Sequence, residues 1–194
     1  MLTKYKNQLM PLTAIIARPF LSWNPSILTL LGLVSSMLFF VGIIGHVYIL
    51  SIISLFGFIF DMLDGYVARA TNKVTAFGGF LDSTLDRVSD FFFITSFGFG
   101  HLVNWDLVVL ALFTSLLISY IRARGEAAFP TANQAKGLMQ RTERVIFLLL
   151  AFFLFLLFPS FSFMHESILA IGFWVIFILN LVTIFQRFSF FAKR

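Results

Sequence analysis

The sequence predicts an all-α integral membrane protein with six transmembrane helices preceded by an amphipathic interfacial helix. Three observations predict it: an apolar composition, six long apolar runs, and basic residues confined to alternate loops. Of 194 residues, 59% are hydrophobic and 12% are charged, and the mean hydropathy is +0.95. So few charges cannot coat a soluble core, and 28 phenylalanines exclude a disordered chain. The absence of cysteine excludes disulfides, thiolate metal sites and a cysteine nucleophile.

The first predicted part, residues 1–23, precedes the apolar runs. Pro11 and Pro19 interrupt it, and it contains no apolar stretch ending at a small-residue cleavage site, so we do not expect a signal peptide. Leu9, Leu12 and Phe20 recur at helical spacing, which favours a helix lying in the membrane interface. A poorly ordered tail is the alternative.

The second predicted part, residues 24–194, is the transmembrane domain. Runs of about 20 apolar residues are long enough to cross a bilayer. Six such runs occur, at 26–45, 47–68, 77–100, 105–124, 143–160 and 167–188. The first begins after Asn24-Pro25-Ser26, in which a capping residue and a proline are typical of a helix start.

Basic residues lie on one side of this arrangement. Thirteen of the 14 lysines and arginines precede the first run, follow the last, or lie in the second-to-third and fourth-to-fifth loops. The positive-inside rule makes that side cytoplasmic. The pI near 9.9 is thereby explained by topology, and we predict no nucleic-acid partner. We expect a multi-pass protein of the plasma membrane with its active site facing the cytoplasm.

Acidic residues are concentrated at the same side. Five of the nine acids lie at the cytoplasmic ends of the second and third runs: Asp61, Asp64, Asp82, Asp86 and Asp90. An acid at the centre of a membrane helix costs about 2.5–3.5 kcal/mol on insertion scales, so such residues normally have a function and a partner. Spacings of i, i+3 and i, i+4 place each of the first two pairs on one helix face.

These clustered carboxylates need cations to remain ionised. Arg69 and Arg87 do not suffice, which points to bound divalent ions. An all-oxygen site selects Mg²⁺, Mn²⁺ or Ca²⁺, and no histidine lies at the ligand spacing that zinc would require.

Small residues accompany the acids. Gly65 and Ala68 continue the helix face of the first acidic pair, and Gly78 lies one turn before Asp82. They allow close helix packing or make room for a bulky ligand. Arg69, a bidentate phosphate donor, favours the ligand.

This pattern resembles the CDP-alcohol phosphatidyltransferase family, and every fixed position of the family motif is filled. The matching string is Asp61-x-x-Asp64-Gly65-x-x-Ala68-Arg69, then eight residues, then Gly78-x-x-x-Asp82-x-x-x-Asp86. Asn24-Pro25-Ser26-Ile27-Leu28-Thr29 also resembles the segment that opens the family's first span. The chain length, the six spans and the interfacial helix fit the family as well.

The resemblance implies a reaction and a set of roles. Such enzymes transfer a phosphatidyl-type group from a CDP-linked lipid to an alcohol hydroxyl and release CMP. By resemblance, Asp61, Asp64 and Asp82 are metal ligands for two Mg²⁺ or Mn²⁺ ions, and Asp86 is both a ligand and the base. Gly65, Ala68, Arg69 and Gly78 would then line the CDP site. The resemblance also implies a homodimer. For Arg87 and Asp90, outside the motif, a structural pairing is the alternative to a role in the chemistry.

A second basic segment resembles the inositol-phosphate-using members of the family. It comprises Tyr120-Ile-Arg122-Ala-Arg124-Gly125-Glu126, with arginine at 122 in place of the usual lysine and glycine at 125 in place of alanine, and Gly137-x-x-x-Arg141-x-Glu143-Arg144. Arg122, Arg124 and Arg141 would bind the phosphate of the acceptor, most naturally inositol phosphate. Plain positive-inside charge is the alternative, which we prefer for Lys136.

Three functional classes remain open at this point. The first is the transferase, with glycerol 3-phosphate as the second choice of acceptor. The second is a divalent-cation transporter, although residues from 105 onward contain no matching acidic cluster. The third is an intramembrane prenyltransferase, whose usual chain is longer. Whether the donor carries diacylglycerol or an archaeal ether lipid stays open.

Overall fold

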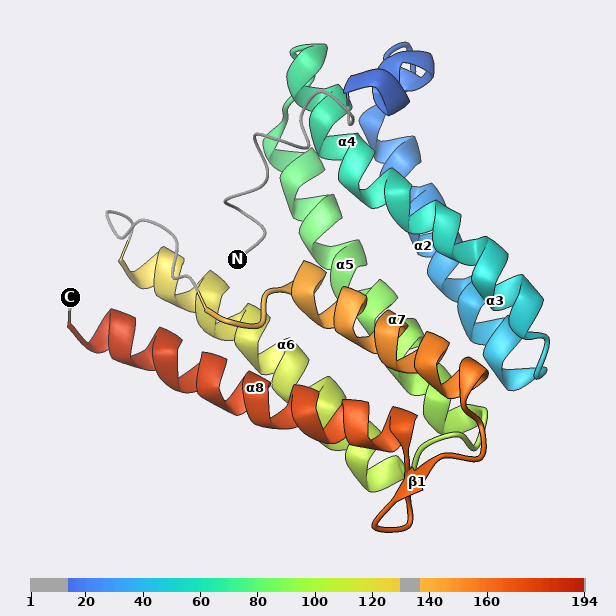
Figure 1. Ribbon diagram of the computed structural model, residues 1–194. Helices are drawn as coiled ribbons and strands as arrows, with labels where there is room; N and C mark the ends of the chain where they lie inside the picture. Colours follow the sequence, from blue (N-terminus) through green and yellow to red (C-terminus); the bar gives the residue numbers. More distant parts are fainter. Residues whose placement is uncertain (1–13, 130–136, 194) are drawn as a thin grey trace. The chain divides into compact units, whose positions relative to one another are not determined.

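The computed structural model describes residues 14–129 and 137–193, and most of them are helical (Figure 1). The described chain divides into two compact units that meet in sequence between Gly100 and His101. Most of the predicted interfacial helix lies outside the described residues. Its described end contains a short 3-10 turn, η2 (Arg18–Phe20), so an interfacial helix over 1–23 stays a prediction.

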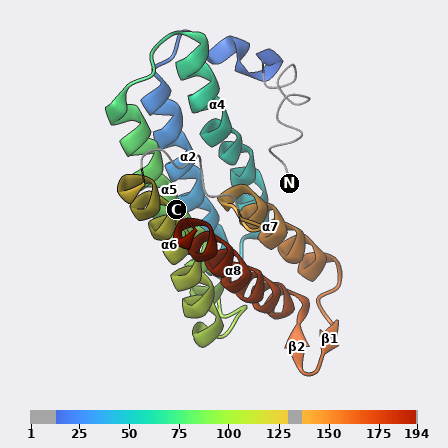
Figure 2. The ribbon, with the colours of Figure 1, turned by 90° about the vertical axis from the view of Figure 1, so that its left-hand side faces the viewer.

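The first unit contains the three predicted runs that precede residue 100. Its helices are α2 (Pro25–Ile44), α3 (Tyr48–Ser54), α4 (Phe58–Ala70) and α5 (Ala76–Phe99), with the 3-10 turn η3 (Leu55–Gly57) joining α3 to α4. Helix α2 packs against α3, α4 and α5, and Figures 1 and 2 show α2 beside α4 and α5 in both views. It is therefore the centre of this unit.

Helix starts follow local capping chemistry. The Asn24 side chain accepts a hydrogen bond from the Ser26 amide at 3.1 Å, and Pro25 occupies the first turn of α2, as predicted. At α5, the Thr75 hydroxyl accepts from the Gly78 amide at 3.0 Å. The second cap places Gly78 at the first turn of the helix that carries Asp82.

Small residues bring α2 close to the chain that carries the first acids. A Cβ atom at Gly57 would overlap the Ser35 side chain, and a Cβ at Gly32 would lie 3.6 Å from the Cβ of Asp61. Further along α2, Phe39 packs against Phe93 of α5 with ring centroids 4.8 Å apart. Close backbone approach on one side and aromatic packing on the other hold α4 and α5 on α2.

The second unit is built on the last helix. It contains α6 (Trp105–Ala128), α7 (Arg141–Leu157), the short hairpin β1 (Ser162–Phe163) and β2 (Glu166–Ser167), and α8 (Ile168–Ala192). Helices α6 and α7 both pack against α8. The buried Asn180 amide of α8 donates to the hydroxyls of Thr114 and Ser115 of α6, at 3.0 and 3.2 Å.

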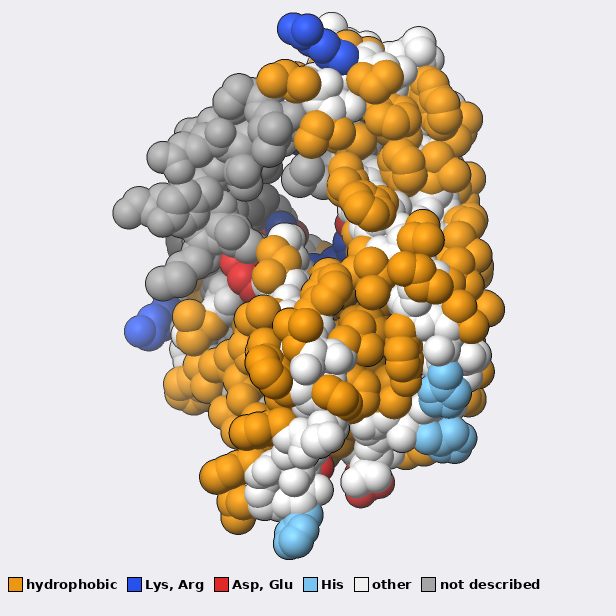
Figure 3. Space-filling model, turned by 45° about the vertical axis from the view of Figure 1, so that its right-hand side comes forward, with side chains coloured by type: hydrophobic (Ala, Val, Ile, Leu, Met, Phe, Trp, Pro, Cys, Tyr) orange, Lys and Arg blue, Asp and Glu red, His pale blue; other side chains and the backbone are white. Residues whose placement is uncertain are grey.

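Four described helices are long and apolar enough to cross a membrane: Pro25–Ile44, the helical stretch Tyr48–Ala70, Trp105–Ala128 and Ile168–Ala192. Helices also occupy the two other predicted positions. However, α5 contains Asp82, Asp86, Arg87 and Asp90, and α7 has only 17 residues. Hydrophobic side chains cover most of the face in Figure 3. The protein is thus a multi-pass membrane protein, and the count of six spans stays a prediction.

Candidate active site

Three carboxylates from α4 and α5, two helices that both pack on α2, meet in one group. Asp61 of α4 and Asp82 and Asp86 of α5 are partly buried, and one oxygen of each lies within 4.8 Å of the other two. The donor set is entirely oxygen, which suits a hard divalent cation. The structure therefore brings together three of the four acids predicted to bind metal.

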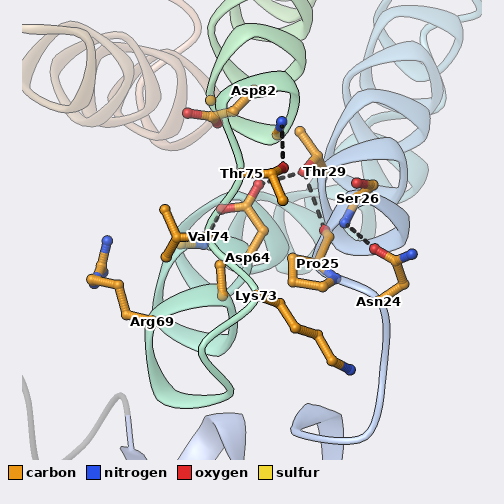
Figure 4. Close-up of a pocket in the computed structure, with 14 residues that line it drawn as sticks. Asn24, Pro25, Ser26, Thr29, Asp64, Arg69, Lys73, Val74, Thr75 and Asp82 are labelled. Atoms are coloured by element: carbon orange, nitrogen blue, oxygen red, sulfur yellow. Dashed lines mark hydrogen bonds between the residues drawn. The ribbon is translucent and has the colours of Figure 1, made fainter.

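The fourth acid, Asp64, lies beside this group and is held by α2. Its Oδ2 accepts a hydrogen bond from the Thr29 hydroxyl at 2.6 Å, and its Oδ1 accepts from the Gly65 amide (Figure 4). Thr29 and Asp64 are both buried, at 5% and 6% exposure. Thr29 precedes Asp64 by 35 residues, so it lies outside the acidic motif, in the segment that resembles the opening of the family's first span.

Arg87 contacts the carboxylate group directly. Its Nη1 lies 3.3 Å from Asp86 Oδ2 and also donates to the Ser83 carbonyl at 2.6 Å. The sequence suggested a structural pairing of Arg87 with Asp90. The structure gives Arg87 a contact with Asp86, the predicted base, and Asp90 is buried at 4% exposure.

A pocket of about 590 Å³ opens beside the acids within the first unit (Figure 4). All four residues predicted to bind CDP line it, together with Asp64 and Asp82. The complete lining is Asn24, Pro25, Ser26, Thr29, Asp64, Gly65, Ala68, Arg69, Lys73, Val74, Thr75, Gly78, Gly79 and Asp82. The motif residues Asp64, Gly65, Ala68, Arg69, Gly78 and Asp82 thus line the same cavity.

The pocket lining contains glycines and two exposed cations. A Cβ at Gly65 would lie 3.3 Å from Arg69 Nη1, whereas a Cβ at Gly79 would meet nothing within 4 Å. Arg69 and Lys73 are exposed, and both side chains extend away from Asp64 in Figure 4. Among the basic residues, Lys73 belongs to the predicted second-to-third loop on the cytoplasmic side, and the sequence assigned it no role in the site. Its place in the loop between the two acidic helices was the available signal.

The three arginines predicted to bind an acceptor phosphate belong to the second unit. Arg122 and Arg124 lie near the end of α6, and Arg141 is the first residue of α7. Arg122 Nε donates to Glu126 Oε1 at 2.9 Å, and Arg124 is exposed. Arg122 is therefore oriented by Glu126, an acid of the same motif.

Two further arginines of this unit are almost completely buried, which the sequence did not predict. Arg144 and Arg187 are each 3% exposed. Arg144 Nη1 donates to the Met139 carbonyl at 3.3 Å, and Arg187 Nη1 donates to the Ile118 carbonyl. These bonds link α7 to the segment before it and α8 to α6.

Known proteins resemble this chain over most of its length. The model of the CDP-alcohol phosphatidyltransferase family matches residues 22–185. An archaetidylinositol phosphate synthase of Pyrococcus horikoshii is 35% identical over 165 residues, covering 84% of this chain and 81% of the relative. A phosphatidylinositol phosphate synthase of Mycobacterium tuberculosis is 32% identical over 190 residues, covering 91% and 83%.

Solved structures extend the likeness to the fold. The crystal structure of the Mycobacterium tuberculosis phosphatidylinositol phosphate synthase with CDP-DAG bound superposes with a TM-score of 0.72 at 29% identity, covering 93% of this chain and 94% of that one. A second crystal structure of that enzyme, in complex with manganese and citrate, gives 0.71 at 31% identity, covering 93% and 89%.

Proposed function

The chain belongs to the CDP-alcohol phosphatidyltransferase family, and we propose that it transfers a phosphatidyl-type group from a CDP-linked lipid to inositol phosphate, releasing CMP. Family membership decides among the three predicted classes in favour of the transferase. The observation that carries the proposal is the pocket lined by Gly65, Ala68, Arg69 and Gly78 beside the acids. Relatives that are named for inositol-phosphate lipid synthesis support the acceptor.

The donor's cytidine diphosphate would occupy the pocket. Gly65, Ala68 and Gly78 leave space along its wall, and the exposed cations Arg69 and Lys73 lie at its edge. A guanidinium matches two phosphate oxygens at once, which makes Arg69 the stronger candidate for the diphosphate.

Asp61, Asp82 and Asp86 would hold the divalent metal. Asp64, whose carboxylate accepts a hydrogen bond from Thr29, would be the fourth ligand. We propose Mg²⁺ or Mn²⁺, and two ions, because four carboxylates balance two divalent charges. The manganese found in the Mycobacterium tuberculosis relative supports a divalent ion. When bound, such ions neutralise the diphosphate and align it for in-line displacement.

Asp86 is proposed as the base. It would accept the proton of the acceptor hydroxyl as that oxygen forms a bond to the lipid-side phosphorus. The bond between this phosphorus and the bridging oxygen breaks, and the electron pair leaves with CMP. The Arg87 contact at 3.3 Å would orient Asp86 before the proton arrives.

The acceptor phosphate would be bound by Arg122, Arg124 and Arg141. A phosphorylated alcohol needs cations that a neutral alcohol does not. We further propose that the protein has six spans after an interfacial helix at residues 1–23, with residues 24–194 forming the transmembrane domain. In this arrangement the basic side and the site face the cytoplasm from the plasma membrane, and the protein is a homodimer.

The deciding experiment measures CMP release by purified protein with Mg²⁺ and a CDP-lipid. Inositol phosphate and glycerol 3-phosphate are offered in parallel, each with a diacyl and an archaeal ether donor. We expect release with inositol phosphate alone. Release only with glycerol 3-phosphate would retain the reaction and refute the acceptor, and no release with any pair would refute the proposed function.

A further inference from the structure

The segment that leads into α7 is anchored by side chains of α8. The Leu138 amide donates to Gln186 Oε1 at 3.1 Å, and the buried Met139 amide donates to Thr183 Oγ1 at 2.9 Å. Both acceptors follow their donors by more than 40 residues. Thr183 and Gln186 are three residues apart, so one face of α8 presents them together.

The hydrogen-bond direction at Thr183 is determined by its surroundings. Its hydroxyl donates to the Leu179 carbonyl one turn earlier at 2.9 Å. With its single hydrogen used there, the oxygen can only accept from Met139. The Met139 carbonyl in turn accepts from Arg144, so both polar groups of this residue are engaged. The peptide at 139 is therefore held on both sides.

Close packing against α8 accompanies the hydrogen bonds of Leu138 and Met139. A Cβ at Gly137 would overlap Thr183 Cγ2, and it would lie 3.6 Å from Arg187 Nε. Glycine at 137 thus allows the chain to lie directly on α8. The resemblance to inositol-phosphate-using members includes this glycine, and the structure supplies a physical reason for it.

The start of α7 depends on this anchor. Gln140, its N-cap residue, makes no side-chain capping bond, so local sequence does little to determine where the helix begins. Arg141 follows immediately as the first helical residue. A shift of the anchored peptide would shift Arg141 with it.

We propose that Thr183 and Gln186 are positioning residues for acceptor binding, which set the place of Arg141 through the peptides of Leu138 and Met139. This inference rests on the proposed function, because it takes Arg141 as a ligand of the acceptor phosphate. It adds α8 side chains to the determinants of acceptor affinity, outside both family motifs.

Three variants distinguish the hydrogen bond between Met139 and Thr183 from the close packing of Gly137 on Thr183. Thr183→Val removes the acceptor oxygen and keeps the shape, and Gly137→Ala inserts the overlapping Cβ. The double variant Gly137→Ala/Thr183→Ser removes the overlapping methyl group and retains the hydroxyl, so it should rescue Gly137→Ala. Thr142→Val, at an exposed position beside Arg141, is the matched control.

Steady-state kinetics of CMP release supply the first measurement. We expect Thr183→Val and Gly137→Ala to raise the KM for the phosphorylated acceptor by about fivefold, the effect of roughly one lost buried hydrogen bond. The KM for the CDP-lipid should change by less than about twofold, a difference equivalent to under half a kcal/mol. Equal rises in both constants, or no rescue by the double variant, would overturn the positioning role.

Hydrogen exchange of the Leu138 and Met139 amides supplies a measurement that needs no substrate. Exchange should be faster in Thr183→Val than in Thr142→Val or wild type. Faster exchange with an unchanged acceptor KM would show an anchor without a positioning role and overturn the inference. A wild-type protein that uses no phosphorylated acceptor would refute the proposed function itself, whatever the variants do.

Discussion

The two units of the molecule hold charges of opposite sign in different ways. In the first, the group Asp61, Asp82 and Asp86 comes from two helices joined by a short loop, and sequence spacing predicts much of its geometry. In the second, the segment before Arg141 is held by α8 side chains more than 40 residues away. The acidic group is thus formed by residues close in sequence, whereas the position of the segment before Arg141 depends on α8, which is distant in sequence.

This difference leads to a kinetic expectation. If the acids perform the chemistry and the arginines bind the acceptor, damage to the first unit should lower kcat and damage to the second should raise the acceptor KM. The predictions below test this division, beginning with the largest effect.

Metal removal should produce the largest loss. Without divalent ions the four carboxylates repel one another and the donor diphosphate, so we expect chelation with EDTA to abolish CMP release. Either Mg²⁺ or Mn²⁺ should restore it. CMP release that persists in excess chelator would refute the metal site and remove the basis of the comparison.

Asp86→Asn should lower kcat by about 10²–10⁴-fold, the usual contribution of a general base, while the protein remains folded. The measurement is CMP release together with the melting temperature. Asp106→Asn, at an exposed residue in the first turn of α6, is the control. Near-normal turnover of Asp86→Asn would refute its role as base.

Arg141→Gln should raise the acceptor KM by about 10- to 100-fold, because a charge-assisted hydrogen bond contributes about 1.5–3 kcal/mol. The KM of the CDP-lipid serves as the internal reference and should stay nearly constant. A fall in kcat with an unchanged acceptor KM would contradict the division between the units.

Thr29→Val should lower kcat by about tenfold, since it removes the hydroxyl that holds the buried Asp64 carboxylate. Thr29→Ser keeps a hydroxyl at the same place and should recover most of the activity. Wild-type kinetics in Thr29→Val would show that Asp64 needs no hydrogen bond from α2. The acidic site would then depend only on residues of α4, α5 and the loop between them.

Alanine at two glycines should give the smallest effects and compare the units directly. At Gly125 a Cβ would overlap the Phe191 ring, and overpacking of this kind costs about 1–3 kcal/mol. At Gly79 a Cβ meets nothing within 4 Å, so the free energy of unfolding should change little. Thermal unfolding in one detergent measures both, and equal melting temperatures would contradict the packing described for the second unit.

Much of the fold and of the donor site could be predicted from sequence. Apolar runs predict where the helices lie, because a chain that crosses lipid must satisfy its backbone hydrogen bonds within helices. The second run is the exception to one helix per run, because it contains α3, η3 and α4. Spacing predicted four acids facing one another, because residues spaced by three or four share a helix face, and three of them form the carboxylate group. The resemblance to the family implied the CDP-site residues that line the pocket. Six spans stay a prediction, since α5 carries the acids that the site requires.

Tertiary structure decided the contacts between residues distant in sequence. Local spacing does not predict the hydrogen bond from Thr29 to Asp64 or the anchor formed by Thr183 and Gln186. Nor does it predict the burial of Arg144 and Arg187. Each depends on which face of one helix packs against another. Periodicity determines that a helix has a face, but only packing determines its neighbour, and hydrogen-bond partners follow from the neighbour.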